Sequence, residues 1–475
     1  MNAKGTILHK SEGFMVGRIL IADEDSSHRI WLNSSLAGAG YCVEAVSDAQ
    51  ALTDRARATA PDVILLPERL AKRSGNVLCA KLRALPETRN AALALIADNA
   101  TRAGRLSAIE SGFDAILRHA PAPRLLRAWV RNLLRRQAAE AELQNALAPA
   151  APLGFAEASD QSMAPPGQIC IIANSLSEGL LWRNNLTARM RDRISVLDPQ
   201  RALQELGNGQ SADAIVISHS AEDPDRSAQL VSELRSRSET LRAAIVLVQE
   251  EPDQESTISA LDFGVNDVLE DGFEAIELSQ VLRREMARKA RDDDRRASLE
   301  SGLRMATFDS LTGLHNRRSA LTLLDRITEA AERTKEQFAV MVLDLDRFKS
   351  INDRFGHRAG DAVLSEVSQR MQNCLRQGDV MARIGGEEFL AVVQSCDAAT
   401  ARVAAERLRR VVADSSVKLG EDGPEISVTI SIGMVLGGSG GSEGSAAELI
   451  DLADRGLYAA KSEGRNQVTI YQSAA

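Results

Sequence analysis

Short runs of apolar residues alternate with helix-favouring segments through the first 290 residues. The apolar runs are residues 17–22, 41–46 and 62–66, and then residues 169–172, 213–217 and 244–247. Uninterrupted apolar runs of this length are typical of strands buried on both faces. Strands that alternate with helices predict a parallel α/β sheet. We therefore predict two α/β modules with parallel sheets, which look like a diverged duplication.

Linker composition and charge divide the chain into six segments. Four prolines between residues 146 and 168 lie among Ala, Ser and Gly, which is typical of a linker. Residues 283–304 are charged and helix-favouring, and they form either a solvated helix face or a stalk helix that pairs with its copy in a dimer. The predicted segments are a tail (1–16), a first module (17–145), a linker (146–167), a second module (168–290), a stalk or linker (291–304) and a C-terminal domain (305–475).

The C-terminal domain has a different order of elements. We expect strands at 338–343, 379–384, 388–394, 426–436 and 467–471, and helices at 348–355, 360–376, 398–414 and 446–462. Two consecutive strands around Gly385 and Gly386 predict a hairpin with glycines at its turn. Glycine removes a side chain where the backbone must turn tightly or approach a ligand.

Composition narrows the kind of protein. The chain has 475 residues, of which 44% are hydrophobic and 26% charged, so it can bury several cores. A net charge of −9 and only 3% aromatic residues argue against nucleic-acid binding. The five scattered cysteines form no CxxC pair, and we find neither a signal peptide nor an apolar run that could span a bilayer. We therefore expect a cytoplasmic protein.

Acidic residues gather at two predicted strand ends of the C-terminal domain. Asp344 and Asp346 end an apolar strand, and Glu387 and Glu388 follow the two glycines of the hairpin. If these segments are neighbours, their carboxylates converge, and hard oxygen ligands there suit Mg²⁺ that also takes substrate phosphates. Taken singly, each feature is weak, because Gly-Gly turns are common and paired acids are usually solvated.

Several ordered motifs add a family resemblance. Lys461 and Arg465, four residues apart near the end of the last predicted helix, could meet a triphosphate. Together with the acidic residues, the motifs of residues 305–472 resemble the GGDEF family of diguanylate cyclases, in its GGEEF form. These motifs are DSLTGLHNRR (309–318), DLDRFKSIND (344–353), FGHRAGD (355–361), IGGEEF (384–389), SIG (431–433), AD (453–454) and KSEGRN (461–466).

The resemblance implies a palm-like α+β domain with an antiparallel sheet that holds one GTP. The 3′-hydroxyl of one GTP would attack the α-phosphate of another, twice, giving cyclic di-GMP and two pyrophosphates. Asp344, Glu387 and the backbone carbonyl of Leu345 would bind Mg²⁺, with Mn²⁺ as the alternative, and Glu388 a second ion. One of the two glutamates would help to deprotonate the 3′-hydroxyl.

The same resemblance assigns the substrate contacts. Asn352 and Asp361 are expected to hydrogen-bond guanine, whose N1–H and amino group form a donor pair that adenine lacks. Phe348 is either a wall of the nucleotide site or part of the core. Lys349, Lys461 and Arg465 are expected to contact phosphates, and Lys349 also belongs to the expected catalytic set with Glu387 and Glu388. Gly385 and Gly386 are expected beside the nucleotide.

An RxxD string, Arg376 to Asp379, lies just upstream of the glycine turn, on the predicted incoming strand. The string alone is weak. At this position it resembles the family's inhibitory site for cyclic di-GMP, where Arg376 would bind phosphate or the Hoogsteen edge and Asp379 the guanine donors. Arg407 is a further candidate for this site. The alternative is a surface ion pair.

The first module resembles a response-regulator receiver domain, with Asp23 and Glu24 as its acidic Mg²⁺ pair. For both front modules this resemblance implies a flavodoxin-like fold with a five-stranded parallel sheet. Pro67 stands where the phosphorylated aspartate is expected, and Ala97 and His119 stand at the switch and lysine positions. Proline has no carboxylate, so this position cannot accept a phosphoryl group.

The second module departs further from that pattern. Asn174 and Ser175 replace the acidic pair, Ser218 stands at the phosphoacceptor position and Asp271 at the lysine position. We therefore predict no phosphoacceptor, and both modules are interpreted as dimerising adaptors. The order of domains resembles the PleD type of response regulator, in which the first receiver is normally phosphorylated, and this chain departs from that type at Pro67.

These inferences predict a homodimeric diguanylate cyclase that is inhibited by its product. One domain holds one GTP, so two domains must face each other for reaction. A histidine kinase or an adaptor is a possible partner. The alternative is a non-catalytic sensor of GTP or cyclic di-GMP, although degenerate sensors usually lose hairpin carboxylates that are present here. A pure phosphorelay adaptor is disfavoured by Pro67 and Ser218.

Overall fold

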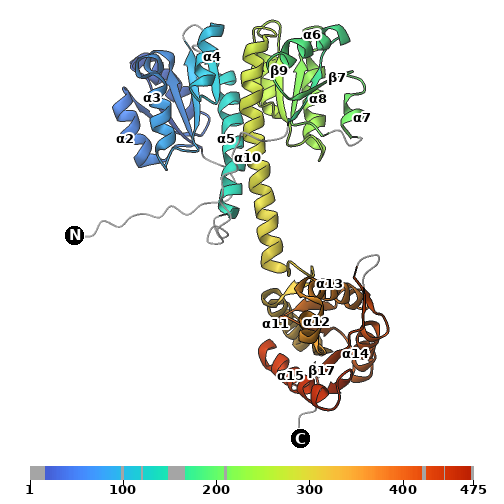
Figure 1. Ribbon diagram of the computed structural model, residues 1–475. Helices are drawn as coiled ribbons and strands as arrows, with labels where there is room; N and C mark the ends of the chain where they lie inside the picture. Colours follow the sequence, from blue (N-terminus) through green and yellow to red (C-terminus); the bar gives the residue numbers. More distant parts are fainter. Residues whose placement is uncertain are drawn as a thin grey trace, which may run out of the picture. The chain divides into compact units, whose positions relative to one another are not determined.

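The computed structural model describes residues 17–97, 101–118, 121–147, 166–207, 211–419, 424–442 and 444–471. The chain divides into two compact units, Met1–Ala297 and Ser298–Ala475 (Figure 1). The predicted tail and most of the predicted linker lie outside the described residues, as does His119.

The first module is a five-stranded parallel sheet in the order β2-β1-β3-β4-β5. Its central strand β3 is buried at every position, as an uninterrupted apolar run predicts. The elements are β1 (Arg18–Ala22), α1 (Ser26–Ala37), β2 (Cys42–Val46), α2 (Ala49–Thr59), β3 (Val63–Pro67), α3 (Glu68–Ala84), β4 (Ala92–Ala97), α4 (Arg102–Glu110), β5 (Ala115–Arg118) and α5 (Pro123–Leu147).

The second module repeats this arrangement. Its strand order, β10-β9-β8-β6-β7, is the same when both sheets are read from the corresponding edge, which confirms the predicted pair of five-stranded parallel sheets. The elements are β6 (Gln168–Ile172), α6 (Leu176–Thr187), β7 (Arg193–Leu197), α7 (Ala202–Gly207), β8 (Ala214–Ser218), α8 (Pro224–Ser236), β9 (Ala244–Val248), α9 (Gln254–Phe263), β10 (Asp267–Leu269) and α10 (Ala275–Thr307).

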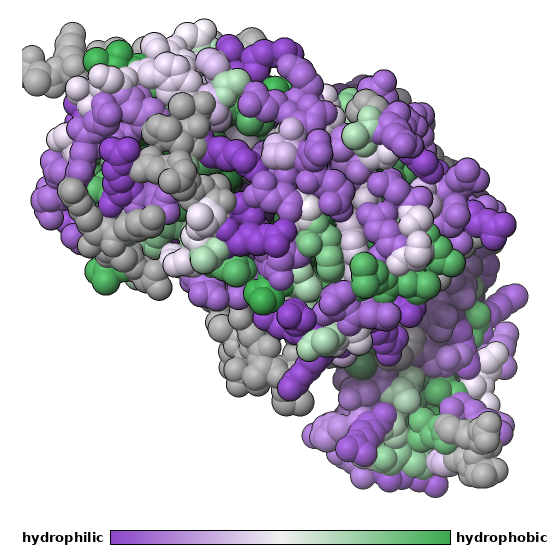
Figure 2. All heavy atoms as spheres, turned by 90° about the horizontal axis from the view of Figure 1, so that it is seen from above, coloured by the Kyte–Doolittle hydropathy of each residue, from purple (hydrophilic) through white to green (hydrophobic). Residues whose placement is uncertain are grey.

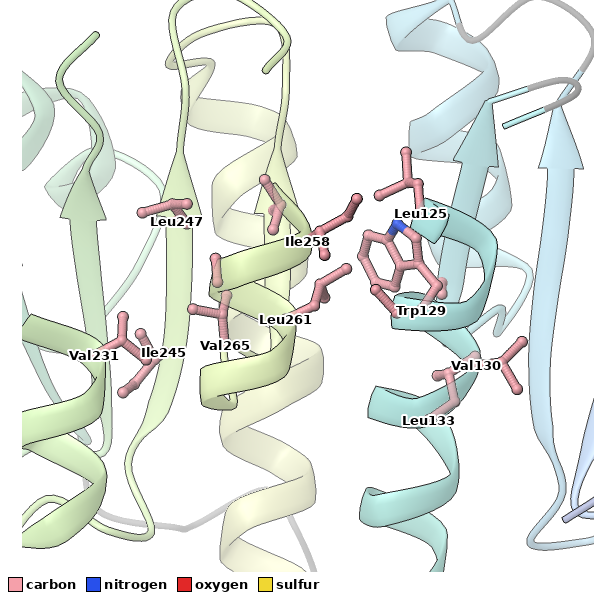
Figure 3. Close-up of a cluster of buried hydrophobic side chains, with 14 of the residues drawn as sticks. Leu125, Trp129, Val130, Leu133, Val231, Ile245, Leu247, Ile258, Leu261 and Val265 are labelled. Carbon is pink, nitrogen blue, oxygen red and sulfur yellow. The ribbon is translucent and has the colours of Figure 1, made fainter. Parts of the chain in front are cut away.

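The two modules share one buried apolar cluster. Trp129 of α5 lies against the side chains that α9 presents, among them Ile258 and Leu261 (Figure 3). Trp129 is buried although it is large, so the contact excludes water across this interface. The modules therefore form one compact unit, and in Figure 1 helices α5 and α10 run beside each other within it.

Helix α10 continues without a break from Ala275 to Thr307. Its buried positions end at Glu285, and the following turns carry ion pairs such as Lys289 to Asp293 at 2.6 Å. The predicted stalk at 291–304 is therefore helical, but it is the continuation of a helix that begins inside the second module.

Polar residues predominate on the face of the molecule seen in Figure 2, where apolar residues form separate small groups.

The C-terminal unit has a six-stranded sheet in the order β11-β13-β14-β12-β17-β18. The central pairs are antiparallel, whereas β11–β13 and β17–β18 are parallel, so the sheet is mixed at its edges. The elements are β11 (His315–Asn316), α11 (Arg317–Thr334), β12 (Gln337–Leu345), α12 (Phe348–Phe355), α13 (His357–Asn373), β13 (Val380–Arg383), β14 (Glu388–Val393), α14 (Ala398–Ala413), β15 (Val417–Lys418), β16 (Glu425–Ile426), β17 (Ile430–Gly438), α15 (Ala446–Ser462) and β18 (Val468–Ile470).

Strand β12 divides its side chains between two cores because successive residues point to opposite faces. Met341 and Leu343 pack with residues of α12, α13 and α14, and Val340 and Val342 pack with residues of α11 and α15. Helices thus cover both faces of the sheet. The residues that follow the apolar run, from Asp344 onward, emerge at one end of a strand that is held rigidly on both sides.

Candidate active site

Carboxylates meet where β12 ends beside the β13–β14 turn. Asp344 lies directly opposite Glu388 in the β12–β14 register, so the two side chains project from the same face of the sheet. The main-chain N–H of Leu345 donates to the carbonyl oxygen of Glu387 at 3.2 Å. Segments that are more than 40 residues apart in sequence are therefore neighbours at this sheet end, as the metal-site hypothesis requires.

The site carries excess negative charge. Asp344 is only 6% exposed, and the ammonium group of Lys461 lies 2.8 Å from one of its oxygens. Burial raises the pKa of Asp344 despite this contact, and the charge of Asp346 raises it further. Burial also raises the pKa of Glu387, and the charge of Asp344 adds to the effect. One lysine therefore does not compensate the acids that gather here.

A divalent cation fits this charge distribution. Asp344, Glu387 and Glu388 supply hard oxygen donors, and Leu345 supplies a nearby main-chain carbonyl. Within the described ranges, no three His, Cys, Asp or Glu side chains are already arranged as a complete ion site. Mg²⁺ is usually bound by one or two carboxylates together with substrate phosphates and water, so a partial protein shell suits it.

Asp346 has a different role from Asp344, although the sequence places both at the strand end. Its carboxylate accepts hydrogen bonds from the hydroxyls of Thr429 and Ser431, at 2.6 and 2.7 Å, and from the main-chain N–H of Asn466 at 3.0 Å. These bonds tie together β12, β17 and the turn after α15. Asp346 is thus a positioning residue.

The turn after α15 presents the basic residues. Lys461 lies in the last turn of α15, which ends at Ser462 as predicted, and Arg465 follows in the turn beyond the helix. Gly464, Arg465 and Asn466 all have positive φ, a conformation that costs free energy for the last two. The bond from Asn466 to Asp346 holds this turn, which leaves Arg465 exposed.

The hairpin turn is fixed by an arginine that the sequence did not single out. Arg383 donates to the carbonyl oxygen of Gly386 at 2.7 Å and to Asp309 at 3.1 Å. Neither Gly385 nor Gly386 has a positive φ, so glycine is not needed there for a left-handed turn. A Cβ on Gly385 would lie 2.5 Å from a carboxylate oxygen of Glu388, so glycine makes room for that side chain.

The residues expected at guanine lie at the junction of α12 and α13. A Cβ on Gly360 would lie 2.0 Å from the side-chain oxygen of Asn352, so only glycine allows this approach. Asp361 and Lys349 are exposed. Phe348 is 5% exposed and belongs to the core cluster on this face of the sheet, which favours the core alternative.

The RxxD residues lie in a turn before β13, not on that strand as expected. Asp379 accepts hydrogen bonds from the main-chain N–H groups of Arg376 at 3.0 Å and Gln394 at 3.2 Å, so its carboxylate holds the turn. The Arg376 side chain is exposed and makes no ion pair among the described residues. Arg407 lines a hollow of about 660 Å³ on α14 that also includes Cys374, whereas Arg376 and Asp379 do not line it.

The receiver-like sites contain no acceptor aspartate at either expected strand end. Pro67 ends β3 as a buried residue, next to Asp23, whose carboxylate contacts Nδ1 of His28 at 2.5 Å. In the second module, Ser218 donates to Glu178 at 2.7 Å and accepts from Asn174 at 3.0 Å.

Asp271, expected at the lysine position of the second module, forms ion pairs with Arg105 and Arg118 of the first module, both at 2.6 Å. This contact could not be predicted from the sequence, because it depends on how the two modules pack. The position therefore serves the interface between them.

Residues 306–467 match the family described as diguanylate cyclase, GGDEF domain. The chain is 31% identical over 456 residues to the response regulator PleD of Caulobacter vibrioides. This alignment covers 96% of the present chain and 99% of PleD. It is 40% identical over 172 residues to diguanylate cyclase A of Treponema denticola, covering 35% of this chain and 45% of that protein.

Among solved structures, the chain is similar to the coiled coil and GGDEF domain of DgcB from Caulobacter crescentus in complex with c-di-GMP, with 31% sequence identity and a TM-score of 0.36. The match covers 40% of this chain and 98% of the DgcB chain. In the part of the chain that the structure describes, no helix is long and apolar enough to cross a membrane. Because the likeness to PleD extends over both receiver-like modules and the domain that carries the site, the chain belongs to the GGDEF family of diguanylate cyclases and has the PleD type of domain organisation.

Proposed function

We propose that the C-terminal domain joins two GTP molecules into cyclic di-GMP and releases two pyrophosphates. The observation that carries this proposal is the gathering of Asp344, Glu387 and Glu388 at one sheet end, beside Lys461. Negative charge that one lysine does not balance, next to exposed basic groups, suits a metal–triphosphate ligand.

Asp344, Glu387 and the carbonyl of Leu345 would hold Mg²⁺, or Mn²⁺ in its place, and Glu388 would hold a second ion. A metal ion held there would lower the pKa of a bound hydroxyl and neutralise phosphoryl charge. Lys461 and Arg465 would bind phosphates from the turn that Asp346 holds. Glu387 or Glu388 would take the proton of the 3′-hydroxyl.

Asn352 and Asp361 would select guanine at the α12–α13 junction, and Lys349 would contact phosphate. The packing of Asn352 against Gly360 supports this reading, because it fixes the amide at a defined place beside the exposed Asp361. A fixed donor and acceptor pair discriminates between bases better than a mobile one, since its ordering cost is already met.

Two copies of the domain must face each other, so the active species is a homodimer. The rate per protein molecule should rise with protein concentration until dimerisation saturates.

We propose domain limits of 17–145, 168–290 and 305–475, joined by a linker at 146–167 and a stalk at 291–304. The cytoplasm is the proposed location because GTP is available there.

The test is incubation of the full chain with GTP and Mg²⁺, followed by separation of cyclic di-GMP and pyrophosphate. Glu388→Gln should lose turnover and keep its circular dichroism spectrum. Asp451→Asn, an exposed change on α15, is the matched control and should retain activity. GTP binding without turnover at every protein concentration would instead favour the alternative, a non-catalytic sensor.

Product inhibition is proposed at Arg376, Asp379 and Arg407. The guanidinium of Arg376 supports it, since this group is exposed, makes no ion pair with any residue that the structure describes, and so is available for phosphate. Arg376→Ala should raise the concentration of cyclic di-GMP needed for half-inhibition, whereas Arg333→Ala, on the exposed side of α11, should not. Asp379 is a poorer test residue because its replacement would also release the turn.

The two front modules would act as adaptors in a response-regulator role without phosphotransfer. Pro67 and Ser218 support this, because neither provides a carboxylate at the strand end. Acetyl phosphate should leave the chain unlabelled, and labelling of the first module would contradict the proposal. A histidine kinase would then be at most a binding partner.

A further inference from the structure

A basic cleft lies between the two front modules. Its volume is about 530 Å³, and it is bounded by α5, by the α8–β9 and α9–β10 connections and by α10. Seven of its 18 lining residues are Arg or Lys and three are Asp or Glu. Two of the seven cations, Arg288 and Lys289, also pair with acids that do not line the cleft, so the remaining cations are its source of excess positive charge. This contrasts with the net charge of −9 for the whole chain.

The duplication shows where part of this excess arises. In the first module, Arg83 donates to the carbonyl of Ala91 at 2.6 Å and to the carboxylate of Asp114 at 2.7 Å. In the second module, the equivalent Arg235 donates to the carbonyl of Ala243 at 2.7 Å, but its other partner is the amide oxygen of Asn266, at 2.8 Å.

The backbone contacts of the two side-chain oxygens are also equivalent. Asp114 accepts from the N–H of Leu93, and Asn266 accepts from the N–H of Ile245, both at 2.8 Å. The second module therefore keeps the geometry and lacks the negative charge. Burial lowers the pKa of Arg235 to about 10, and the neighbouring guanidinium groups of Arg136 and Arg135 add to this effect.

Other cations of the cleft are available to a ligand. Arg235 uses all its N–H groups on protein oxygens and so contributes charge only. Arg242 has one ion pair, with Asp293 at 3.9 Å, and its side chain is 56% exposed. Arg296 makes no ion pair among the residues described and lines the cleft from α10.

We propose that this cleft binds a small anion carrying two or more phosphate groups, such as an inorganic pyrophosphate or a nucleoside diphosphate. Guanidinium groups bind phosphate oxygens in a bidentate manner. A ligand with two phosphate groups can contact several of these guanidinium groups at once, whereas a single carboxylate contacts fewer. The volume suits a small molecule. Such a ligand would connect α5, the start of β9 and α10.

The test is isothermal titration calorimetry of the full chain with pyrophosphate. It is carried out in a Lys461→Ala/Arg465→Ala background, which removes the phosphate contacts proposed at the cyclase site, so the result does not depend on that proposal. Arg242→Gln/Arg296→Gln should weaken binding at least about tenfold, because each lost charge-assisted hydrogen bond weakens phosphate binding.

Arg291→Gln is the matched control, since Arg291 is exposed on the same helix and does not line the cleft. Equal pyrophosphate affinity in the double variant and this control, or no binding in the background chain, overturns the proposal. Tighter binding of ADP than of pyrophosphate identifies a nucleotide as the ligand, and the reverse identifies inorganic pyrophosphate. Sulfate that binds as tightly as either probe also overturns the proposal, because it shows a salt site only.

Discussion

Two Arg–Glu ion pairs link the same two front modules but differ in burial. Glu285 on α10 has a side chain that is 1% exposed and pairs with Arg136 of α5. Glu255 on α9 pairs with Arg124 of α5 at 2.9 Å, and these side chains are 69% and 68% exposed. The same kind of ion pair can therefore be compared in a buried and in an exposed environment. Glu285→Gln removes the charge of the buried carboxylate, and Glu255→Gln removes that of the exposed one.

The pKa of Glu285 sets the expected magnitude. Burial alone would raise this pKa, but the guanidinium groups of Arg136, Arg284 and Arg288 outweigh burial and lower it from 4.5 to about 2. A shift of this size corresponds to roughly 3 kcal/mol of unfolding free energy at neutral pH. Glu285→Gln should therefore cost roughly 3 kcal/mol, and Glu255→Gln less than about 1 kcal/mol.

The pH dependence has a definite sign. Because the folded pKa of Glu285 is depressed, its contribution is complete above the ordinary value of 4.5 and is lost as the pH falls toward 2. The difference in stability between the native chain and Glu285→Gln should shrink over that range. Glu255→Gln should show no comparable change.

The assay is urea unfolding followed by tryptophan fluorescence. All three tryptophans, Trp31, Trp129 and Trp182, lie in the first unit, so the signal reports that unit. Trp129 itself is at the interface between the modules. Equal losses for the two variants, or a loss below about 1 kcal/mol for Glu285→Gln, would refute the argument that the buried carboxylate among its guanidinium groups stabilises the fold more than the exposed pair does.

Three further predictions concern the C-terminal unit. Gly433→Ala should lower its stability by about 3 kcal/mol in circular dichroism melts, because the new Cβ would lie 2.0 Å from a main-chain nitrogen of α15. Asp344→Asn should abolish the rise in melting temperature caused by Mg²⁺ and leave the metal-free melting temperature unchanged or higher. The pKa values of Asp344 and Glu387 are raised in the native chain, so protonation as the pH falls should increase its metal-free stability. The same protonation should reduce the stabilisation by Mg²⁺. Arg383→Gln should reduce kcat by about tenfold with little change in the melting curve, since it frees the turn that carries Glu387; an unchanged kcat would contradict a positioning role.

The sequence predicted the architecture better than the details of the site. Uninterrupted apolar runs indicated the parallel sheets, and the acids after an apolar strand indicated a metal site at its end. The position of the acids at the strand end did not by itself separate Asp344 from Asp346, because their roles depend on which hydroxyl groups lie near them in the fold. Arg383 was missed for a similar reason, since its partner Asp309 is 74 residues away in the chain.

The front modules differ from phosphorylated receivers in where their charge lies, and this limits how they can transmit a signal. A phosphoryl group works by adding charge at a strand end, and Pro67 and Ser218 leave no carboxylate to receive it. The interface between the modules, in contrast, combines a buried apolar cluster with the buried Glu285 pair, so the modules should move as one body. Any signal must therefore change the charge or contacts of that body by binding, and the excess positive charge near Arg235 is the feature of this interface that an anionic ligand would neutralise.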